Sequence, residues 1–498
     1  MHALAHAGAS TLEGSPYVKV TGGMIGVFFA GAVFSLTTAN PWLTAASVLS
    51  LPLYMALLWR KGETPVLLFA VSFQWLQVSA KVFHANVLGV PISDIGWWLG
   101  GSSPSIERAV WLGLIGLAVL AFGMRLGMRK LAPTGHAQAA EETRTFSVDR
   151  AFLLYLIGAA ATAVVAQYAW IFGSVTQILL SAVAVKWVFF FLLGYLVIQR
   201  NERYLYFLAA IAIEFIGGIG FFSGFKTVLF VTLLVIVTVR YQLRPGVIVM
   251  GTVVLAALLV FGAAWTSVKN EYRNFLTQGE QTQTTVVSRS EQLGRLGELI
   301  GSLSWEDVQE GMEPLFIRIA YVDFFALTMD FVPEYRPHEG GNVWMESILH
   351  VLQPRVFFPD KPVLKSDSEF TMRYTGLFLA SGDEGTSISI GYMGESYIDF
   401  GVPGMFVPIF MMGFFWGWLY AFFISRAQSA IFGYAFATAL LIEAYQFEMA
   451  GIKMLGGVTM KFMVLALLLY FLEPRLRTWL EGGSAPARLA RPSLAHGT

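Results

Sequence analysis

Apolar residues come in long stretches along most of the chain, and short polar turns separate them. A membrane hydrocarbon core about 30 Å thick is crossed by roughly 20 mostly apolar residues in a helix. About twelve stretches meet this requirement, and they predict about twelve membrane-spanning helices. Their ranges are 22–39, 42–59, 64–82, 108–128, 151–172, 176–198, 204–222, 226–241, 247–267, 403–424, 430–449 and 454–472.

The composition strengthens this interpretation. Hydrophobic residues make up 56% of the 498 residues and charged residues 13%, whereas soluble domains are about 25% charged. A formal net charge of zero argues against a nucleic-acid binder or a disordered chain. The lack of cysteine excludes disulfides and thiolate metal sites. We therefore expect an all-α polytopic integral membrane protein.

Basic residues predict the orientation of these helices, because cytoplasmic loops carry an excess of Lys and Arg. Turns that follow odd-numbered spans contain almost none. Turns that follow even-numbered spans, and the C-terminal tail, hold most of them, and we expect both termini in the cytoplasm. The first apolar stretch lacks a convincing cleavage site and is interpreted as a retained helix. The basic residues concerned are Arg60, Lys61, Arg129, Lys130, Arg144, Arg150, Arg200, Arg203, Arg240, Arg244, Arg426, Arg475, Arg477, Arg488 and Arg491.

One long segment, 268–386, has no convincing span and is predicted to face outside. It holds 10 Lys/Arg and 18 Asp/Glu, a net charge of −8, so the rest of the chain carries +8. Apolar spacing predicts helices over 288–301 and 305–329. The apolar face of the second helix either lies on the membrane plane or packs on the loop's own core; its residues are Leu315, Ile319, Val322 and Phe325.

These observations divide the chain into four parts. An N-terminal bundle of about nine helices spans 1–267, and a large outer loop with short helices spans 268–402. Three further membrane helices span 403–474, and a cytoplasmic tail spans 475–498.

The end of the outer loop contains a proline-rich segment, 353–362, that forbids a regular helix. It holds Arg355 and Lys361 in an extended stretch beside the bilayer. Two cations in such a place suit a diphosphate or another anionic group. The alternative is a solvated loop whose charge is balanced by Asp360 and Asp367.

The next polar residues, Glu395 and Asp399, stand four apart before the tenth span. A helix would place both on one face at the outer mouth of the membrane domain. A partly buried carboxylate there could act as a general base. The alternative is a helix-start acid that complements the helix dipole.

Ionisable residues also fall inside spans, where they are costly and suggest function. Lys186, Glu214 and Lys461 could form a polar path, although Lys186 and Glu214 could equally form a buried ion pair. Lys226, near the outer mouth, could meet a lipid phosphate or simply snorkel at a helix end. Nucleotide-binding, kinase and zinc-protease motifs are absent from the sequence, and we expect neither a metal nor a cofactor.

Two of these segments resemble the bacterial O-antigen and exopolysaccharide repeat-unit polymerases (Wzy type). A Pro-Arg-x-x-Phe-Pro-x-Lys-Pro stretch precedes a Gly-x-x-Gly-Glu-x-Tyr-x-x-Phe-Gly-x-x-Gly stretch that enters a membrane helix. The matching residues are Pro354, Arg355, Phe358, Pro359, Lys361, Pro362, Gly391, Gly394, Glu395, Tyr397, Phe400, Gly401 and Gly404.

The resemblance implies a GT-C-like inner-membrane glycosyltransferase that acts at the periplasmic face. Such enzymes move a growing glycan from undecaprenyl diphosphate onto a new lipid-linked repeat unit and need no nucleotide sugar. They act with membrane lipid around them and, in some cases, a chain-length regulator protein; nucleic acid is not a partner. The paired arginine–glycine motif of some members is not evident at Arg318, Arg355 or Arg373.

Pre-placed cations stabilise the negative charge that grows on a leaving diphosphate. We therefore expect Arg355 and Lys361 to be catalytic, and Glu395 to deprotonate the acceptor hydroxyl. Further residues are expected to hold the lipid diphosphate or the glycan: Lys226, Arg318, Arg373 and Tyr397, with Tyr392, Trp344 and Tyr374 as other sugar-stacking candidates. A glycan ligase of similar architecture and a flippase or transporter of lipid-linked oligosaccharide are the alternative functions.

Overall fold

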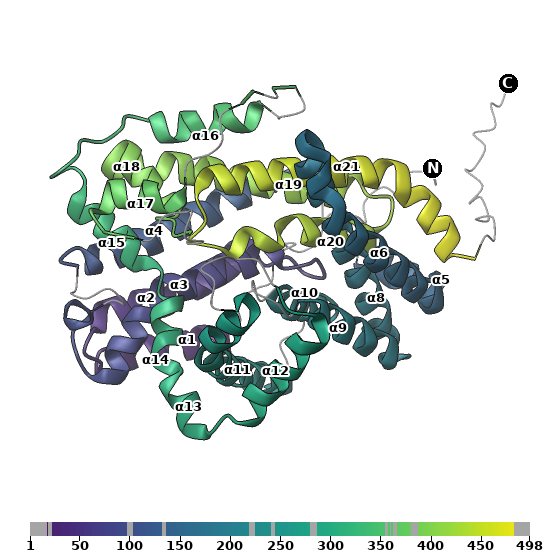
Figure 1. Ribbon diagram of the computed structural model, residues 1–498, viewed down its shortest axis with the longest axis horizontal. Helices are drawn as coiled ribbons and strands as arrows, with labels where there is room; N and C mark the ends of the chain where they lie inside the picture. The colour runs from purple at the N-terminus through teal and green to yellow at the C-terminus, as the bar shows by residue number, and fades with distance from the viewer. Residues whose placement is uncertain are drawn as a thin grey trace, which may run out of the picture.

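The computed structural model of this protein is built almost entirely of helices (Figure 1). Apart from helices, turns and loops, the described part has one isolated bridge, between Tyr17 and Arg60. The prediction of an all-α protein is therefore confirmed. The residues that the structure describes are 17, 22–96, 103–131, 136–218, 225–240, 245–278, 286–353, 357–358, 360–361, 366–379 and 387–482.

The N-terminal half contains eleven helices among these residues. They are α1 (Gly22–Ser35), α2 (Pro41–Leu58), α3 (Val66–Leu88), α4 (Ile106–Gly127), α5 (His136–Thr145), α6 (Val148–Tyr168), α7 (Thr176–Ala182), α8 (Val185–Arg200), α9 (Tyr204–Gly218), α10 (Phe225–Val239) and α11 (Pro245–Thr277). Short 3-10 turns η1 (Ile92–Asp94) and η2 (Ala169–Val175) lie between them.

The C-terminal half begins with short helices and ends with long ones. They are α12 (Arg289–Gly301), α13 (Trp305–Glu310), α14 (Met312–Ile319), α15 (Val322–Phe331), α16 (Asn342–Leu352), α17 (Asp367–Thr375), α18 (Tyr392–Gly404), α19 (Phe406–Arg426), α20 (Ala430–Leu441) and α21 (Gly451–Leu480). The 3-10 turn η4 (Ile442–Tyr445) separates α20 from α21.

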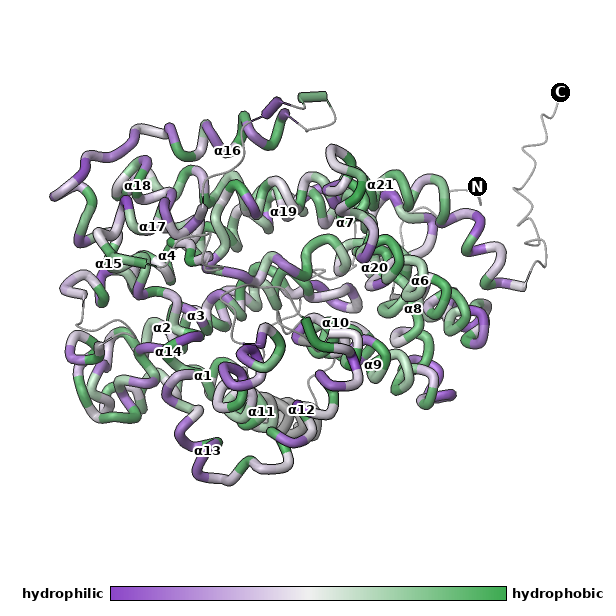
Figure 2. The backbone as a smooth tube through the Cα atoms, viewed as in Figure 1, coloured by the Kyte–Doolittle hydropathy of each residue, from purple (hydrophilic) through white to green (hydrophobic). Residues whose placement is uncertain are grey.

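Six helical segments of the described part are long and apolar enough to cross a membrane, so the protein is membrane-embedded. They are Pro41–Leu58, Val66–Leu88, Ile106–Gly127, Val148–Arg200, Phe406–Arg426 and Gly451–Leu480. Figure 2 shows hydrophobic residues along α6, α8, α9 and α20, and hydrophilic ones on α13. A helix lies on each of the twelve predicted stretches, and the count of twelve spans stays a prediction.

Among the described helices, α4 and α19 form the most extensive pairing. Gly123 and Gly127 on α4 face Gly413 and Gly417 on α19. A methyl group added at Gly417 would lie 2.0 Å from the Met124 carbonyl oxygen, and the other three glycines are similarly tight. Two small-xxx-small patterns therefore let the two backbones approach closely, as in helix pairs within membranes.

The predicted basic turns that the structure describes gather at one end of the bundle, which we call the basic end; Arg244, Arg488 and Arg491 lie outside the described residues. Arginine side chains there donate hydrogen bonds to carbonyl oxygens of neighbouring turns. The pairs are Arg60 with Leu131, Arg200 with Thr143, Arg150 with Trp479, and Arg240 with Ile198. This grouping agrees with the predicted parity of the helices, while the compartment that this end faces stays a prediction.

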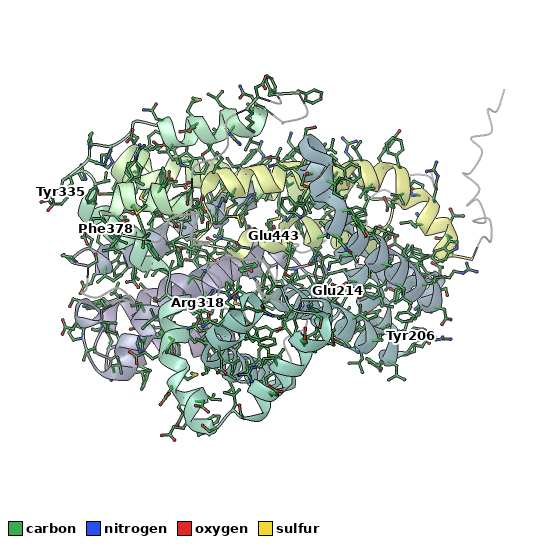
Figure 3. All side chains as sticks on the ribbon, viewed as in Figure 1. Tyr206, Glu214, Arg318, Tyr335, Phe378 and Glu443 are labelled. Carbon is green, nitrogen blue, oxygen red and sulfur yellow. The ribbon has the colours of Figure 1, made fainter. Side chains whose placement is uncertain are left out.

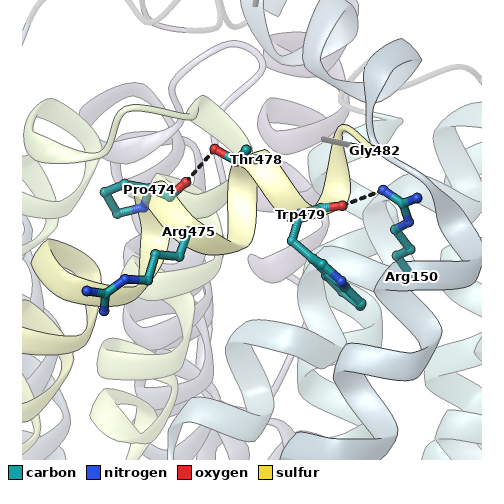
Figure 4. Close-up of a pocket in the computed structure, with 6 residues that line it drawn as sticks. All are labelled: Arg150, Pro474, Arg475, Thr478, Trp479 and Gly482. Atoms are coloured by element: carbon teal, nitrogen blue, oxygen red, sulfur yellow. Dashed lines mark hydrogen bonds between the residues drawn. The ribbon is translucent and has the colours of Figure 1, made fainter. Parts of the chain in front are cut away.

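A groove of about 690 Å³ lies at the basic end, beside the last turns of α21 (Figure 4). Arg150 closes one side by donating a 2.6 Å hydrogen bond to the Trp479 carbonyl oxygen. Arg475 and Thr478 line the opposite side.

The segment predicted as one helix over 305–329 is three helices instead, α13, α14 and α15. Pro314 lies in the first turn of α14, where its missing N–H is tolerated but a continuous helix from α13 is not. Ala320 then leaves the helical region with ψ of 73°. Val322 and Phe325 are buried in the main core, so this part of the apolar face packs on protein rather than on a membrane plane.

Candidate functional site

A cavity of about 1,120 Å³ opens between α11, α13 and α14, and Ser387 and Ile388 form part of its wall. Three cations line it: Lys269, Arg273 and Arg318. Lys226, at the start of α10, is close enough for its charge to act on Lys269. We call these four residues the cation cluster. Figure 3 shows Arg318 directed from α14 toward the interior of the molecule.

Local sequence explains why α11 and α14 bring these cations together. The helix α11 continues through Thr277, past the apolar stretch that ends at 267, so Lys269 and Arg273 share one face at i and i+4. Side-chain contact then holds α14 against α11, because Leu315 packs on Gly262. Arg318 lies one turn farther along α14 and reaches the same cavity.

The cluster lies at the end of the bundle opposite the basic end. Lys226 begins α10, whereas Arg240, just beyond the end of that helix, bonds to the basic end. Fifteen residues of helix separate the two ends by about 22 Å. The apolar helices therefore lie between two groups of positive charge.

Electrostatics inside the cluster are unfavourable for the protein alone. Lys269 is only 5% exposed, and burial lowers its pKa to about 7, with further lowering by Arg318, Arg273 and Lys226. Burial also lowers the pKa of Arg318, although Glu448 partly opposes this. Among the described residues, no hydrogen bond or ion pair engages the side chains of Lys226, Lys269 or Arg318. Such a cluster strongly favours an anion.

Three acidic side chains line the cavity wall, Asp307, Glu310 and Asp323, and two of them are already engaged with other groups. Asp323 is ion-paired with Lys81, which is buried on α3. Asp307 accepts a 2.7 Å hydrogen bond from the backbone N–H of Ser304 and caps α13. The cations of the cluster are therefore not neutralised by these two carboxylates.

Glu395 lies on α18 and is buried, at 5% exposure. Its Oε2 accepts a 2.7 Å hydrogen bond from the Gly451 N–H, the first residue of α21. Burial raises its pKa to about 7; the bond to Gly451 opposes this rise, and the charges of Asp367 and Asp399 add to it. The carboxylate thus caps a helix start and is also able to hold or release a proton near neutral pH.

Asp399 has a similar structural role on another helix. Its two carboxylate oxygens accept hydrogen bonds from the N–H groups of Val343, at 3.0 Å, and Trp344, at 2.8 Å, in the first turn of α16. The helix-start alternative is therefore what the structure shows for Asp399, although the helix that it caps is α16 rather than its own.

A short hydrogen-bonded connection leads from the cavity toward Glu395. Ser387, in the cavity wall, donates a 3.1 Å hydrogen bond to Asp367 Oδ2. The same oxygen accepts a 2.5 Å hydrogen bond from Lys453. Both Asp367 and Lys453 act electrostatically on Glu395, so the carboxylate lies beside this connection.

The other predicted residues that the structure describes lie away from the cation cluster. Arg355 falls outside the described residues. Lys361 lies with α16 and α21, where its Nζ donates a hydrogen bond to the His350 carbonyl oxygen. Arg373 is exposed on α17, beside Tyr374.

Tyr397 is buried, at 3% exposure. Its hydroxyl donates a 3.1 Å hydrogen bond to the Val332 carbonyl oxygen, and its ring contacts Phe325 and His338. This placement gives Tyr397 a role in the core rather than a surface for a sugar. Of the predicted cations that the structure describes, only Lys226 and Arg318 are therefore brought together.

Sequence reasoning missed Lys269 and Arg273. The signal was present in the sequence, since the two cations follow the ninth apolar stretch directly and stand four residues apart. They were counted with the loop because the apolar stretch ends before them.

The predicted alternative of an ion pair is confirmed for Lys186 and Glu214, whose charged atoms are 2.6 Å apart. Tyr155 donates a further hydrogen bond to Glu214, at 3.2 Å. Within the described ranges, His, Asp and Glu side chains form no group of three or more that could hold a metal ion.

A family model described as "Domain of unknown function (DUF8712)" matches residues 102–473, which include every residue of the cation cluster and Glu395. Neither a curated protein nor a solved structure matches this chain.

Proposed function

The chain belongs to the DUF8712 family, and we propose that it is a membrane glycosyltransferase that polymerises lipid-linked oligosaccharide repeat units. The donor and acceptor are glycans carried on undecaprenyl diphosphate, and the reaction takes place at the periplasmic face of the bacterial inner membrane. Both chain termini then lie in the cytoplasm, together with the basic end.

The observation that carries this proposal is the cation cluster at the end of the apolar helices. A lipid diphosphate places its charge where the hydrocarbon region ends, and Lys269, Arg273 and Arg318 line a cavity there. The motif around Glu395 that resembles repeat-unit polymerases adds separate support. A cavity of about 1,120 Å³ is large enough for a diphosphate and several sugar atoms.

In the proposed reaction, a hydroxyl oxygen of the acceptor glycan attacks the anomeric carbon of the donor. The bond between that carbon and the diphosphate oxygen breaks, and the electron pair leaves with the lipid diphosphate. Lys226, Lys269, Arg273 and Arg318 stabilise the added negative charge. The hydroxyl proton passes to Glu395, whose pKa of about 7 suits a general base at neutral pH.

A reconstitution experiment tests this proposal. The purified protein is placed in liposomes with lipid-linked glycan extracted from a strain that lacks it, without any nucleotide sugar. We expect the products to lengthen into polymer with the unmodified protein. Arg318→Ala should reduce the rate at least tenfold, because a charge-assisted contact is worth about 1.5–3 kcal/mol.

Arg295→Ala serves as the matched control, since Arg295 is an arginine of α12 paired with Glu271 and Glu298 away from the cavity. It should polymerise normally. Net movement of lipid-linked glycan across the liposome membrane without elongation would refute the proposal and favour a transporter. Accumulation of long unattached polymer in the deletion strain would refute it in favour of a ligase.

A further inference from the structure

A second cavity, of about 330 Å³, lies between α7, α16 and α21, and we call it the lysine cavity. Lys361, Lys453 and Lys461 line it, and its described lining contains no carboxylate. Leu180, Ile452 and Met460 add apolar surface. Three ammonium groups beside apolar side chains are suited to a ligand with one anionic end and one hydrocarbon end.

The course of α21 creates the space. A methyl group added at Gly457 would meet no atom within 4 Å, and at Gly456 only Val351, at 3.5 Å. Lys453 lies in the first turn of α21 and Lys461 two turns later, roughly 12 Å deeper along the helix. The two glycines therefore leave room beside the helix between the two lysines.

Ion pairs hold two of these lysines in place without filling the cavity. Lys453 pairs with Asp367, and Lys461 pairs with Glu443, whose side chain is 49% exposed. Lys461 falls within a predicted membrane span, where a charge is costly and commonly marks a ligand path. An anionic headgroup is thus able to add to the existing pairs.

The outer face of α16 has no protein partner among the described residues and is apolar. Met345, Ile348, Leu349 and Leu352 recur at helical spacing and are between 41% and 68% exposed. The helix runs along α21, as Figure 1 shows. Because α21 is long and apolar enough to cross a membrane, acyl chains are the chemistry that matches this face.

We infer that the lysine cavity binds the phosphate group of a second lipid, which enters sideways from the bilayer past α16. The inference rests on the proposed function, in which two lipid-linked molecules must meet. Ser387 of the first cavity and Lys453 of the second bond to the same oxygen of Asp367. The two phosphate sites would therefore flank Glu395, which lies beside that connection.

Native mass spectrometry of the purified full chain tests the inference, with undecaprenyl diphosphate and phosphatidylglycerol as separate probes. The unmodified protein should retain two undecaprenyl diphosphate molecules. Lys361→Gln combined with Lys461→Gln should retain one, and Arg318→Ala should lose the other. The matched control is Lys61→Gln, at the basic end, which should retain both; Lys361→Arg with Lys461→Arg checks that charge rather than fold is responsible.

The two probes distinguish the source of the lipid. If the glutamine variant loses phosphatidylglycerol instead, the site is supported and its ligand is a bulk phospholipid. Unchanged retention of both lipids by a folded glutamine variant would overturn the inference. If the glutamine variant loses one lipid but Arg318→Ala still retains two undecaprenyl diphosphate molecules, the result contradicts the diphosphate site of the proposed function and supports the lysine cavity.

Discussion

Replacing Lys269 by methionine should stabilise the ligand-free protein. The pKa of Lys269 falls from 10.5 to about 7 in the folded protein, and each pKa unit corresponds to about 1.4 kcal/mol. The full penalty for a charged Lys269 is therefore about 5 kcal/mol. Water in the cavity screens part of it, so we expect Lys269→Met to gain about 2 kcal/mol near pH 7.

This gain should depend on pH in a defined direction. Below pH 7 both the folded and the unfolded chain hold the proton on Lys269, and the penalty is complete. Between about pH 7 and 10.5 the unfolded chain holds more protons than the folded chain, so the stability of the unmodified protein rises with pH. The advantage of Lys269→Met should therefore shrink as pH increases from 7 to 9.

The same substitution should weaken binding of a diphosphate. Farnesyl diphosphate, a short lipid diphosphate, serves as the probe in a titration of the detergent-solubilised protein. One lost charged contact of about 1.5–3 kcal/mol predicts an affinity at least tenfold lower. Binding to the unmodified protein should weaken above pH 7, as Lys269 loses its proton, whereas binding to the variant should change less over the same pH range.

Thermal unfolding followed by intrinsic fluorescence at pH 6.5, 7.5 and 9 measures the stability effect. An increase in Tm of several degrees at pH 6.5, declining toward pH 9, is expected. Equal Tm values for the two proteins at every pH, or a lower Tm for Lys269→Met, would refute the reasoning. Lys61→Met, at the exposed turn after α2, is the control and should change neither Tm nor binding.

Three further substitutions test other parts of the structure. Glu395→Gln keeps an oxygen for the α21 cap, so we expect normal protein yield but no polymer, checked by gel analysis of cell polysaccharide. Lys186→Met leaves the buried charge of Glu214 uncompensated and should cost about 3–5 kcal/mol, seen as a lower Tm; adding Glu214→Leu should recover most of it, and an additive loss would contradict the pairing. Gly417→Val meets the α4 backbone and should give aggregated protein in size-exclusion chromatography, whereas Gly217→Ala, in open space, should elute normally.

The hydrophobic pattern by itself determined the class of fold. Apolar stretches long enough to cross a bilayer must satisfy their backbone hydrogen bonds internally, which selects helices. The same pattern located all twelve helical regions, and the basic residues between them identified the turns that gather at one end. These features are local or depend on simple alternation along the chain, so composition and spacing suffice to predict them.

The breaks within the outer segment were only partly predictable. Proline at 314 marks the boundary between α13 and α14, but the end of α14 at Ala320 follows from packing of the next helix into the core. Similarly, the spacing of Glu395 and Asp399 was enough to place both on one helix, but not to predict which helix starts they cap. Glu395 caps α21 at Gly451, 56 residues later in the chain, and Asp399 caps α16 at Trp344, 55 residues earlier.

Only the tertiary structure decided which cations act together. Lys226, Lys269, Arg273 and Arg318 are spread over three helices, and the sequence links only Lys269 and Arg273, through their four-residue spacing. The contact of α14 with α11 brings these charges to one cavity. Lys361 instead lines the lysine cavity, where it donates a hydrogen bond to the His350 carbonyl oxygen of α16. Long-range electrostatics depends on distances that only packing sets, and for this reason the sequence could not predict which cations share a cavity.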